Sequence, residues 1–397
     1  MKIARFLAEI LCYLLIIFVS GELSLRSFLG SSDLDGNFSF GNYWLCPHHL
    51  PIQRAKETSR QWVRDKSSCD YDPALGWVPS PGKKGTLYVN NAGSIRVASE
   101  GDPIAFVPRP GVLRIAIFGD SFTYGYEVGF KDTWGAQLEN ILKEQGIDAQ
   151  VLNFGVPGYG MDQAYLRWKK EGYRYAPEIV IFGLLGDDVS RNANLLPQIR
   201  DLPKWPPLFK PRFILENDRL KLVNSPTPDP QKVVGILEHY GSWELSRYEY
   251  WYDPGKYKDS IWLKSRFLSL GLSFLDRLKD KDPAARETLK LLGLKILGSF
   301  KADVESHGSR FYVLNLWDRG DLRSMLRGGH PDYVDFFKEA EKIRPMIDPG
   351  PKLLEQARRT SIGSLFGMSH YSAEANKIVA EVAADYIIKE LQKLKGV

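Results

Sequence analysis

The chain has 397 residues, which is longer than one minimal domain and long enough to bury a large core. Its apolar fraction of 44% excludes an intrinsically disordered chain, because disordered chains carry too few apolar side chains to form a core. The 53 basic and 48 acidic residues are interspersed and give a net charge of +5 without a basic run, so we expect no nucleic-acid partner.

The N-terminus carries a targeting or anchoring segment. Lys2 and Arg5 precede an apolar run from Ile10 to Val19, and this charge order predicts a cytoplasmic N-terminus with the rest of the protein outside. Two interpretations stay open: an uncleaved signal anchor over residues 1–23, or a signal peptide cut near Gly21 that yields a secreted protein. The run ends without an Ala-x-Ala site or a lipoprotein cysteine, which favours an anchored protein that faces the periplasm or the cell surface.

Residues 24–110 form an extension in which turn signals replace helical or strand periodicity. We expect it to pack across the following domain as a short antiparallel addition, with Arg96 at the surface. The alternative is that Arg96 reaches the mouth of an active site. Cys46 and Cys69 fall in this extension and would form a disulfide in an oxidising compartment or remain two free thiols. Neither cysteine has a metal-ligand spacing, so we expect no metal site.

From residue 111 to residue 397, apolar strands alternate with amphipathic helices. This alternation predicts a three-layer α/β/α domain around a central parallel sheet. The expected strands cover residues 112–118, 150–154, 179–184 and 308–317, and the last helix begins at Ser372. Residues 200–300 interrupt the pattern with prolines and then many Trp and Tyr residues, which indicates an inserted, helical, aromatic-rich region. We expect an aromatic satellite core there, and a platform for sugar rings or an acyl chain is the alternative.

Ser121 follows the first of these strands in the run Gly119-Asp120-Ser121-Phe122, where a helix is about to begin. A serine at this place exposes its hydroxyl, and the N–H groups of the turn point toward a developing negative charge. His370 lies in a loop just before the last helix, where an imidazole can take the serine proton. The pair predicts acyl transfer, and His330 is the fallback base.

These segments resemble the SGNH/GDSL family of serine hydrolases, in particular its membrane-anchored bacterial branch, over residues 111–397 apart from the insertion. The resemblance implies an SGNH, flavodoxin-like fold in which Ser121 is the nucleophile and His370 the base. It also implies an oxyanion hole built from the N–H groups of Ser121 and Gly158. Two family positions differ: Asp187 stands where the family has an asparagine, and Gly367 stands where its Asp-x-x-His block has the acid.

The Asp187 carboxylate, if ionised, accepts hydrogen bonds and cannot donate one to an oxyanion. Three outcomes stay open: burial protonates Asp187, or Asp187 pairs with Arg191 while Asn192 supplies the amide, or two backbone donors act alone. We favour the pairing with Arg191. For the missing acid, Asp318 after the late strand is a candidate, and a Ser–His dyad without an acid is the alternative.

The sequence therefore predicts a membrane-anchored hydrolase of acylated cell-envelope or extracellular polysaccharide, or of a small ester. A sugar hydroxyl as acceptor would make it an O-acetyltransferase, and loss of the site would leave a binding protein with the same fold. We expect no cofactor, because Gly155-x-x-Gly158 lacks the lysine of a phosphate loop and the full dinucleotide pattern. The number of subunits is not predicted.

Overall fold

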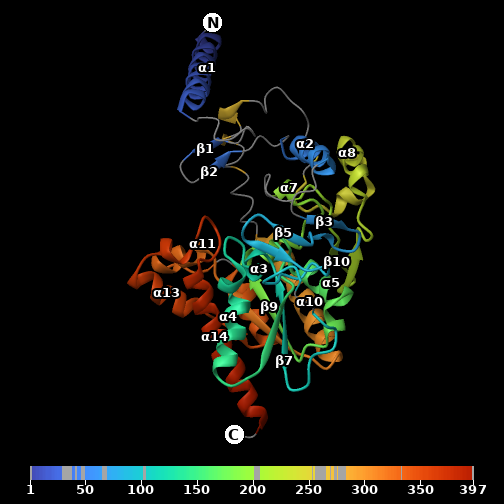
Figure 1. The fold of residues 1–397 in the computed structure, drawn as a ribbon. Coiled ribbons are helices and arrows are strands. Elements are labelled where there is room, and N and C mark those ends of the chain that lie inside the picture. Colours follow the sequence, from blue (N-terminus) through green and yellow to red (C-terminus); the bar gives the residue numbers. More distant parts are fainter. Residues whose placement is uncertain are drawn as a thin grey trace.

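The computed structural model describes residues 2–28, 38–40, 43–45, 50–64, 69–101, 104–200, 206–252, 254, 265–268, 270–271, 275, 283–331 and 333–395. A five-stranded parallel sheet lies at its centre in the order β13-β12-β9-β7-β8 (Figure 1). Its strands are β7 (Leu113–Gly119), β8 (Ala149–Asn153), β9 (Ile179–Leu185), β12 (Arg310–Leu316) and β13 (Met346–Ile347). In chain order this is the arrangement 2-1-3-4-5, so the direction of winding reverses beside β7. Open α/β sheets bind their ligands at the carboxyl ends of strands next to such a reversal.

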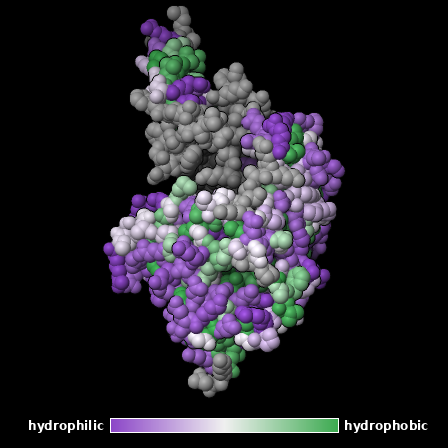
Figure 2. All heavy atoms as spheres, viewed as in Figure 1, coloured by the Kyte–Doolittle hydropathy of each residue, from purple (hydrophilic) through white to green (hydrophobic). Residues whose placement is uncertain are grey.

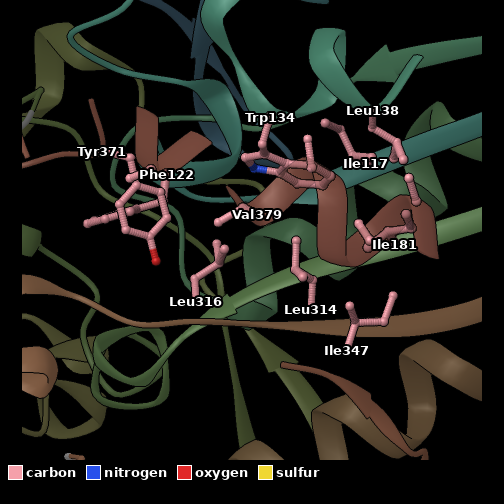
Figure 3. Packing of buried hydrophobic residues seen from close by; sticks show 14 of the residues in the cluster. Ile117, Phe122, Trp134, Leu138, Ile181, Leu314, Leu316, Ile347, Tyr371 and Val379 are labelled. Atoms are coloured by element: carbon pink, nitrogen blue, oxygen red, sulfur yellow. The ribbon is translucent and has the colours of Figure 1, made fainter. Parts of the chain in front are cut away.

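Helices cover both faces of the sheet, which confirms the predicted three-layer fold. Every residue of β7 and β9 is buried, as expected for parallel strands between two helical layers. On one face, Ile117 and Ile181 pack with Trp134 and Val379, which lie on α4 (Trp134–Glu144) and α14 (Ala373–Lys395) (Figure 3). The opposite face is covered by α5 (Met161–Lys170), α6 (Gly186–Arg191), α10 (Pro283–Ser306) and α12 (Val334–Ile343).

The N-terminal extension contains short antiparallel hairpins. They are β1–β2 (Phe38–Phe40, Tyr43–Leu45), β3–β4 (Cys69–Asp72, Gly76–Pro79) and β5–β6 (Gly82–Lys84, Tyr88–Asn90). Arg96 joins the extension to the main sheet, because it bridges both Asn90 and Asn153. The expectation of a surface arginine is wrong: Arg96 is 1% exposed, since its guanidinium has backbone carbonyls to pair with inside the protein.

Cys46 lies outside the described residues, so the predicted disulfide between Cys46 and Cys69 stays a prediction.

The insertion packs as a cluster of its own. It contains β10 (Arg212–Glu216), β11 (Arg219–Val223) and α8 (Pro230–Glu238), and α8 packs on α2 (Leu50–Arg64) of the extension. The rings of Phe209, Tyr240 and Trp243 pack against one another within this cluster. These contacts are those of an aromatic satellite core.

The remaining helices are α1 (Lys2–Phe28), α3 (Ser121–Tyr124), α7 (Pro197–Arg200), α11 (Arg319–Leu326) and α13 (Gly350–Arg359). In α1, residues Arg5–Ser27 are long and apolar enough to cross a membrane. The helix stands at one end of the molecule, with exposed apolar side chains along it (Figures 1 and 2). The same properties belong to a signal sequence, so the length and composition of α1 fit both interpretations.

Candidate active site

A sharp turn between β7 and α3 positions Ser121. Gly119 ends the strand with φ +152°, and a Cβ there would lie 2.4 Å from the carbonyl oxygen of Gly183 on β9, so this position requires glycine. Asp120 then caps α3, because its carboxylate accepts a hydrogen bond of 2.8 Å from the Phe122 N–H. Ser121 therefore opens a helix at the carboxyl end of β7.

His370 reaches Ser121 from the other end of the sequence. Its Nε2 lies 2.8 Å from Ser121 Oγ, a hydrogen-bond distance between a hydroxyl and an imidazole. The ring packs against Phe122 and Tyr126, with centroid separations of 5.0 and 5.1 Å, and the side chain is 15% exposed. The structure thus brings together the serine and the histidine singled out by the sequence, whereas His330 bonds through its carbonyl to Ser324 on α11.

A third residue, Glu127, contacts the other side of the imidazole, and no local sequence pattern indicates it. Its Oε1 lies 2.9 Å from His370 Nδ1, and its carboxylate also accepts hydrogen bonds from the Met368 N–H and the Ser369 N–H. Burial raises the pKa of Glu127, but the hydrogen bonds from His370 and Ser369 outweigh it, and its pKa is lowered. Glu127 is therefore an ionised neighbour of the imidazole.

Asp318 does not occupy this place. Its carboxylate accepts a 2.8 Å hydrogen bond from the Asp321 N–H and caps α11. An aspartate just before a helix satisfies an N–H group that the helix itself leaves unpaired, which accounts for Asp318. Asp318, one candidate for the acid, thus serves as a helix cap, and it is Glu127 that lies on the Nδ1 side of His370.

The loop after β8 lies against the serine turn. Gly155 packs so closely on α3 that a Cβ there would lie 2.4 Å from the Tyr124 backbone nitrogen. Gly158, three residues later, is buried with φ +83°, in the left-handed region that favours glycine. Gly158 thus lies in the same loop as Gly155, three residues after the point at which this loop contacts α3, the helix that begins with Ser121.

Asp187 is paired rather than protonated. Its carboxylate contacts Arg191, with an Oδ2–Nη2 distance of 3.0 Å, and also Arg200. Burial raises the pKa of Asp187, yet the charges of Arg200 and Arg191 outweigh burial and hold its pKa well below the usual range. Of the three alternatives for Asp187, the pairing with Arg191 is the one present, and Arg200 is a second partner.

Asn192, the fallback amide, is fully buried. Its Oδ1 accepts a 3.1 Å hydrogen bond from the Asp162 N–H. Within the described part of the chain, its Nδ2 has no hydrogen-bond partner. A buried amide donor without a partner is uncommon, so this Nδ2 stands out among the polar groups of the described residues.

Arg191 connects the three loops of the site. Its Nη1 donates to Asp120 Oδ2 at 3.0 Å, to Asp188 Oδ1 at 2.9 Å and to the Tyr159 carbonyl at 3.2 Å. One guanidinium thereby fixes the serine turn, the loop after β8 and the start of α6. No group of three or more His, Cys, Asp or Glu side chains suited to a metal ion lies among the described residues.

Residues 115–205 match the family model for GDSL-like lipase/acylhydrolase, a range that holds Ser121, Glu127, Gly158 and Asp187. Among solved structures, TesA is 12% identical with a TM-score of 0.36 and covers 68% of this chain and 95% of its own. The esterase EstA from Pseudoalteromonas sp. is 10% identical, with a TM-score of 0.34 and coverage of 70% and 99%. The acetyl xylan esterase AlAXEase is 12% identical, with a TM-score of 0.36 and coverage of 69% and 99%. None of the curated proteins compared with the chain matches it.

Proposed function

We propose that the chain is an ester-hydrolysing enzyme of the GDSL-like lipase/acylhydrolase type, and that it works through an acyl-enzyme on Ser121 with His370 as general base. The observation that carries this proposal is the 2.8 Å contact between Ser121 Oγ and His370 Nε2. A serine hydroxyl is a weak nucleophile until a base takes its proton, and this imidazole is within reach to do so.

The reaction has two halves. In the first, Ser121 Oγ attacks the ester carbonyl carbon while its proton moves to His370 Nε2, and the imidazolium then protonates the departing alkoxide. In the second, a water molecule gives its proton to Nε2 and attacks the acyl carbon. The bond between the acyl carbon and Oγ then breaks, and Nε2 returns the proton to Oγ, which frees the acid and restores the serine and the neutral histidine. A sugar hydroxyl in place of that water would give an O-acetyltransferase through the same acyl-enzyme.

For the oxyanion we propose two backbone donors, the N–H groups of Ser121 and Gly158, with the Asn192 amide as a third. The ionised Asp187 cannot donate a hydrogen bond, and its charge is offset by Arg191 and Arg200. Removal of a single oxyanion donor costs about 2.7–4 kcal/mol of barrier in other hydrolases, so two backbone donors can sustain turnover at a reduced rate.

We propose an acylated polysaccharide of the cell envelope or surroundings as substrate. The support is an exposed rim beside His370. The Tyr126 ring is 38% exposed and stacks on Tyr88 at a centroid distance of 5.1 Å, and Met368 is 85% exposed. A flat aromatic surface with polar edges suits the face of a sugar ring.

We further propose that α1 is a retained anchor and that the catalytic domain lies outside the cytoplasm. The end of α1 contacts the insertion: the Glu22 carboxylate accepts hydrogen bonds from Ser265 Oγ at 2.8 Å and from the Phe267 N–H at 2.9 Å. The Phe267 ring also packs edge-on against Phe18. Cleavage near Gly21 would remove Phe18 and break up this contact.

A fluorophosphonate probe, which labels activated serines covalently, tests the proposed function on the full chain in detergent. We expect labelling of the wild-type protein and of the control Ser306→Ala, whose exposed serine lies at the end of α10, and none of Ser121→Ala. Folded wild-type protein without label would instead support a binding protein that has lost its activity.

A membrane-impermeant form of the probe, applied to intact cells or spheroplasts, tests the proposed location. It should label Ser121, and labelling only after lysis would contradict a catalytic domain outside the cytoplasm.

A further inference from the structure

We propose that Glu127 is the residue that positions His370. It takes the place of the acid that the related family has at position 367. Ser121, His370 and Glu127 would then form a catalytic triad whose carboxylate comes from the loop after the nucleophile. This inference rests on the proposed roles of Ser121 and His370. Glu127 would act through the histidine and make no contact with the substrate, so it is a positioning residue.

The first support is the geometry of the imidazole. Glu127 Oε1 lies 2.9 Å from Nδ1, and Ser121 Oγ lies 2.8 Å from Nε2 of the same ring. The carboxylate is itself held by three donors, the Met368 N–H at 2.6 Å, the Ser369 N–H at 3.1 Å and Ser369 Oγ at 2.9 Å. Its side chain is only 10% exposed, so water competes little for these contacts.

The second support is the space around Gly367. A Cβ at this position would lie 2.4 Å from Glu127 Oε2, and the next nearest atoms, at 3.6 and 3.7 Å, also belong to Glu127. The backbone of Gly367 is outside the left-handed region, so the conformation itself would accept a side chain. The carboxylate of Glu127 therefore occupies the volume that a side chain at 367 would enter, and a side chain there would have to displace it.

The third support is the way in which the backbone of Glu127 is fixed. Its φ of +73° is unfavourable for a residue with a side chain, and such conformations persist where the surroundings enforce them. Buried Arg96 donates to the carbonyls of Gly125 at 3.1 Å and Val128 at 2.7 Å, on either side of Glu127. The Glu127 N–H donates to Tyr88 Oη at 3.0 Å. These contacts hold the loop in the conformation in which the carboxylate points at His370.

Glu127 would keep the imidazole in the tautomer that has its proton on Nδ1 and its lone pair on Nε2. When the Ser121 proton moves to Nε2, the ionised carboxylate would stabilise the resulting imidazolium, and Nδ1 would keep its own proton. The proton on Nε2 then leaves with the alkoxide, so Glu127 has the same charge before and after each turnover.

The first experiment measures kcat and KM of the solubilised full chain with p-nitrophenyl acetate. For Glu127→Gln, which keeps the volume but removes the charge, we expect kcat to fall on the order of 10³-fold with KM changed only a few-fold. The matched control Glu355→Gln alters an exposed glutamate on α13 and should behave as wild type. Wild-type kcat in Glu127→Gln would overturn the proposal, whereas wild-type protein without any Ser121-dependent turnover would overturn the proposed function itself.

The second experiment moves the carboxylate. Glu127→Ala removes the acid, and Gly367→Asp places a second carboxylate against the first, so each single variant should lose activity. The double variant Glu127→Ala/Gly367→Asp has both the room and the acid, and we expect its kcat to exceed that of Glu127→Ala by about 10-fold or more. A purely structural role for Glu127 would give no such recovery, so a double variant that melts like wild type but is no faster than Glu127→Ala contradicts the exchange.

Discussion

Asp187 is a carboxylate, which cannot donate a hydrogen bond, at a position where the related family has a hydrogen-bond donor for the oxyanion. The family resemblance places an amide donor at this position, and the chain has a carboxylate held by Arg191 and Arg200. The two guanidinium groups neutralise the charge that would otherwise repel the oxyanion. The site thus loses a donor there without acquiring a net negative charge.

Asp187→Asn should therefore raise turnover. The substitution supplies an amide and leaves the two arginines with less negative charge to offset, and both changes favour an oxyanion. We expect a several-fold higher kcat. Because the Asp187 side chain is 31% exposed, loss of its ion pairs should lower the free energy of unfolding by only about 1 kcal/mol.

Steady-state kinetics and thermal melting of Asp187→Asn check both parts of this prediction. Asp335→Asn is the control, since Asp335 forms an exposed pair with Lys338 on α12. A marked loss of turnover in folded Asp187→Asn would show that the carboxylate does necessary work in the site.

At this scale, the sequence identified what a short motif determines and missed what only tertiary structure determines. Ser121 and His370 each belong to a local pattern, the turn after a strand and the loop before a helix. Glu127 has no such pattern, because its role depends on a contact with a loop 243 positions away in the sequence. Arg96 was misplaced for a related reason: an arginine in a turn-rich segment resembles a surface residue until the carbonyls that bury it are known.

At the scale of elements, glycines set how closely the loops of the site approach one another. Gly155 allows the loop after β8 to touch α3, where a Cβ would lie 2.4 Å from the Tyr124 backbone nitrogen. Since this neighbour is backbone, it cannot rotate away as a flexible side chain can. The loop can pack against the helix of Ser121 only because Gly155 has no Cβ.

Gly155→Ala should consequently separate the loop from α3. We expect a loss of about 1–3 kcal/mol of unfolding free energy, the usual cost of overpacking, together with a fall in kcat. The matched control is Gly298→Ala in the middle of α10, where a Cβ would meet no atom within 4 Å. That control should stabilise the protein by about 0.5–1 kcal/mol and leave kcat unchanged. Equal effects of the two substitutions in denaturant titrations would contradict this account.

The principal strands were predicted within a few residues, because a parallel strand covered on both faces is a continuous apolar run. Residues 112–118 and 179–184 were expected, and β7 and β9 cover Leu113–Gly119 and Ile179–Leu185. The edge strand β13 has only two residues and gives no periodic signal. The helices α11 and α13 were also not anticipated, since they are short and pack mainly against each other and the end of the sheet.

At the scale of the whole molecule, the insertion and the catalytic domain are joined through a buried carboxylate. Glu249 lies within the aromatic-rich segment, between Tyr248 and Tyr250, and is 3% exposed. Its Oε2 accepts hydrogen bonds from the N–H groups of Leu195 and Leu196, at 2.6 and 2.9 Å, in the segment that leads from α6 to α7. Nearby, Arg200 joins Trp251 of the insertion to Asp187, so the insertion contacts the surroundings of the active site by two routes.

Burial raises the pKa of Glu249 from 4.5 to about 7, despite the hydrogen bonds from Leu196 and Leu195 that act in the opposite direction. Between these two values the folded protein binds more protons at this position than the unfolded chain. The stability that Glu249 contributes is thus fully present below the unfolded pKa and is lost as the pH rises through about 7. Glu127, with a lowered pKa, acts in the opposite direction and only at more acidic pH.

Glu249→Gln, which cannot ionise, should remove this pH dependence. We expect the variant to gain on the order of 3 kcal/mol relative to wild type between about pH 5 and pH 8. At the acidic end it should be slightly less stable, because an amide nitrogen replaces one of the oxygens that accept from the Leu195, Leu196 and Trp251 N–H groups. Urea titrations at the two pH values measure the difference, with the exposed Glu355→Gln as the control that should show none. A difference between wild type and Glu249→Gln that stays constant from pH 5 to pH 8 would mean that Glu249 does not titrate in this range, and that the joint between insertion and catalytic domain is insensitive to pH.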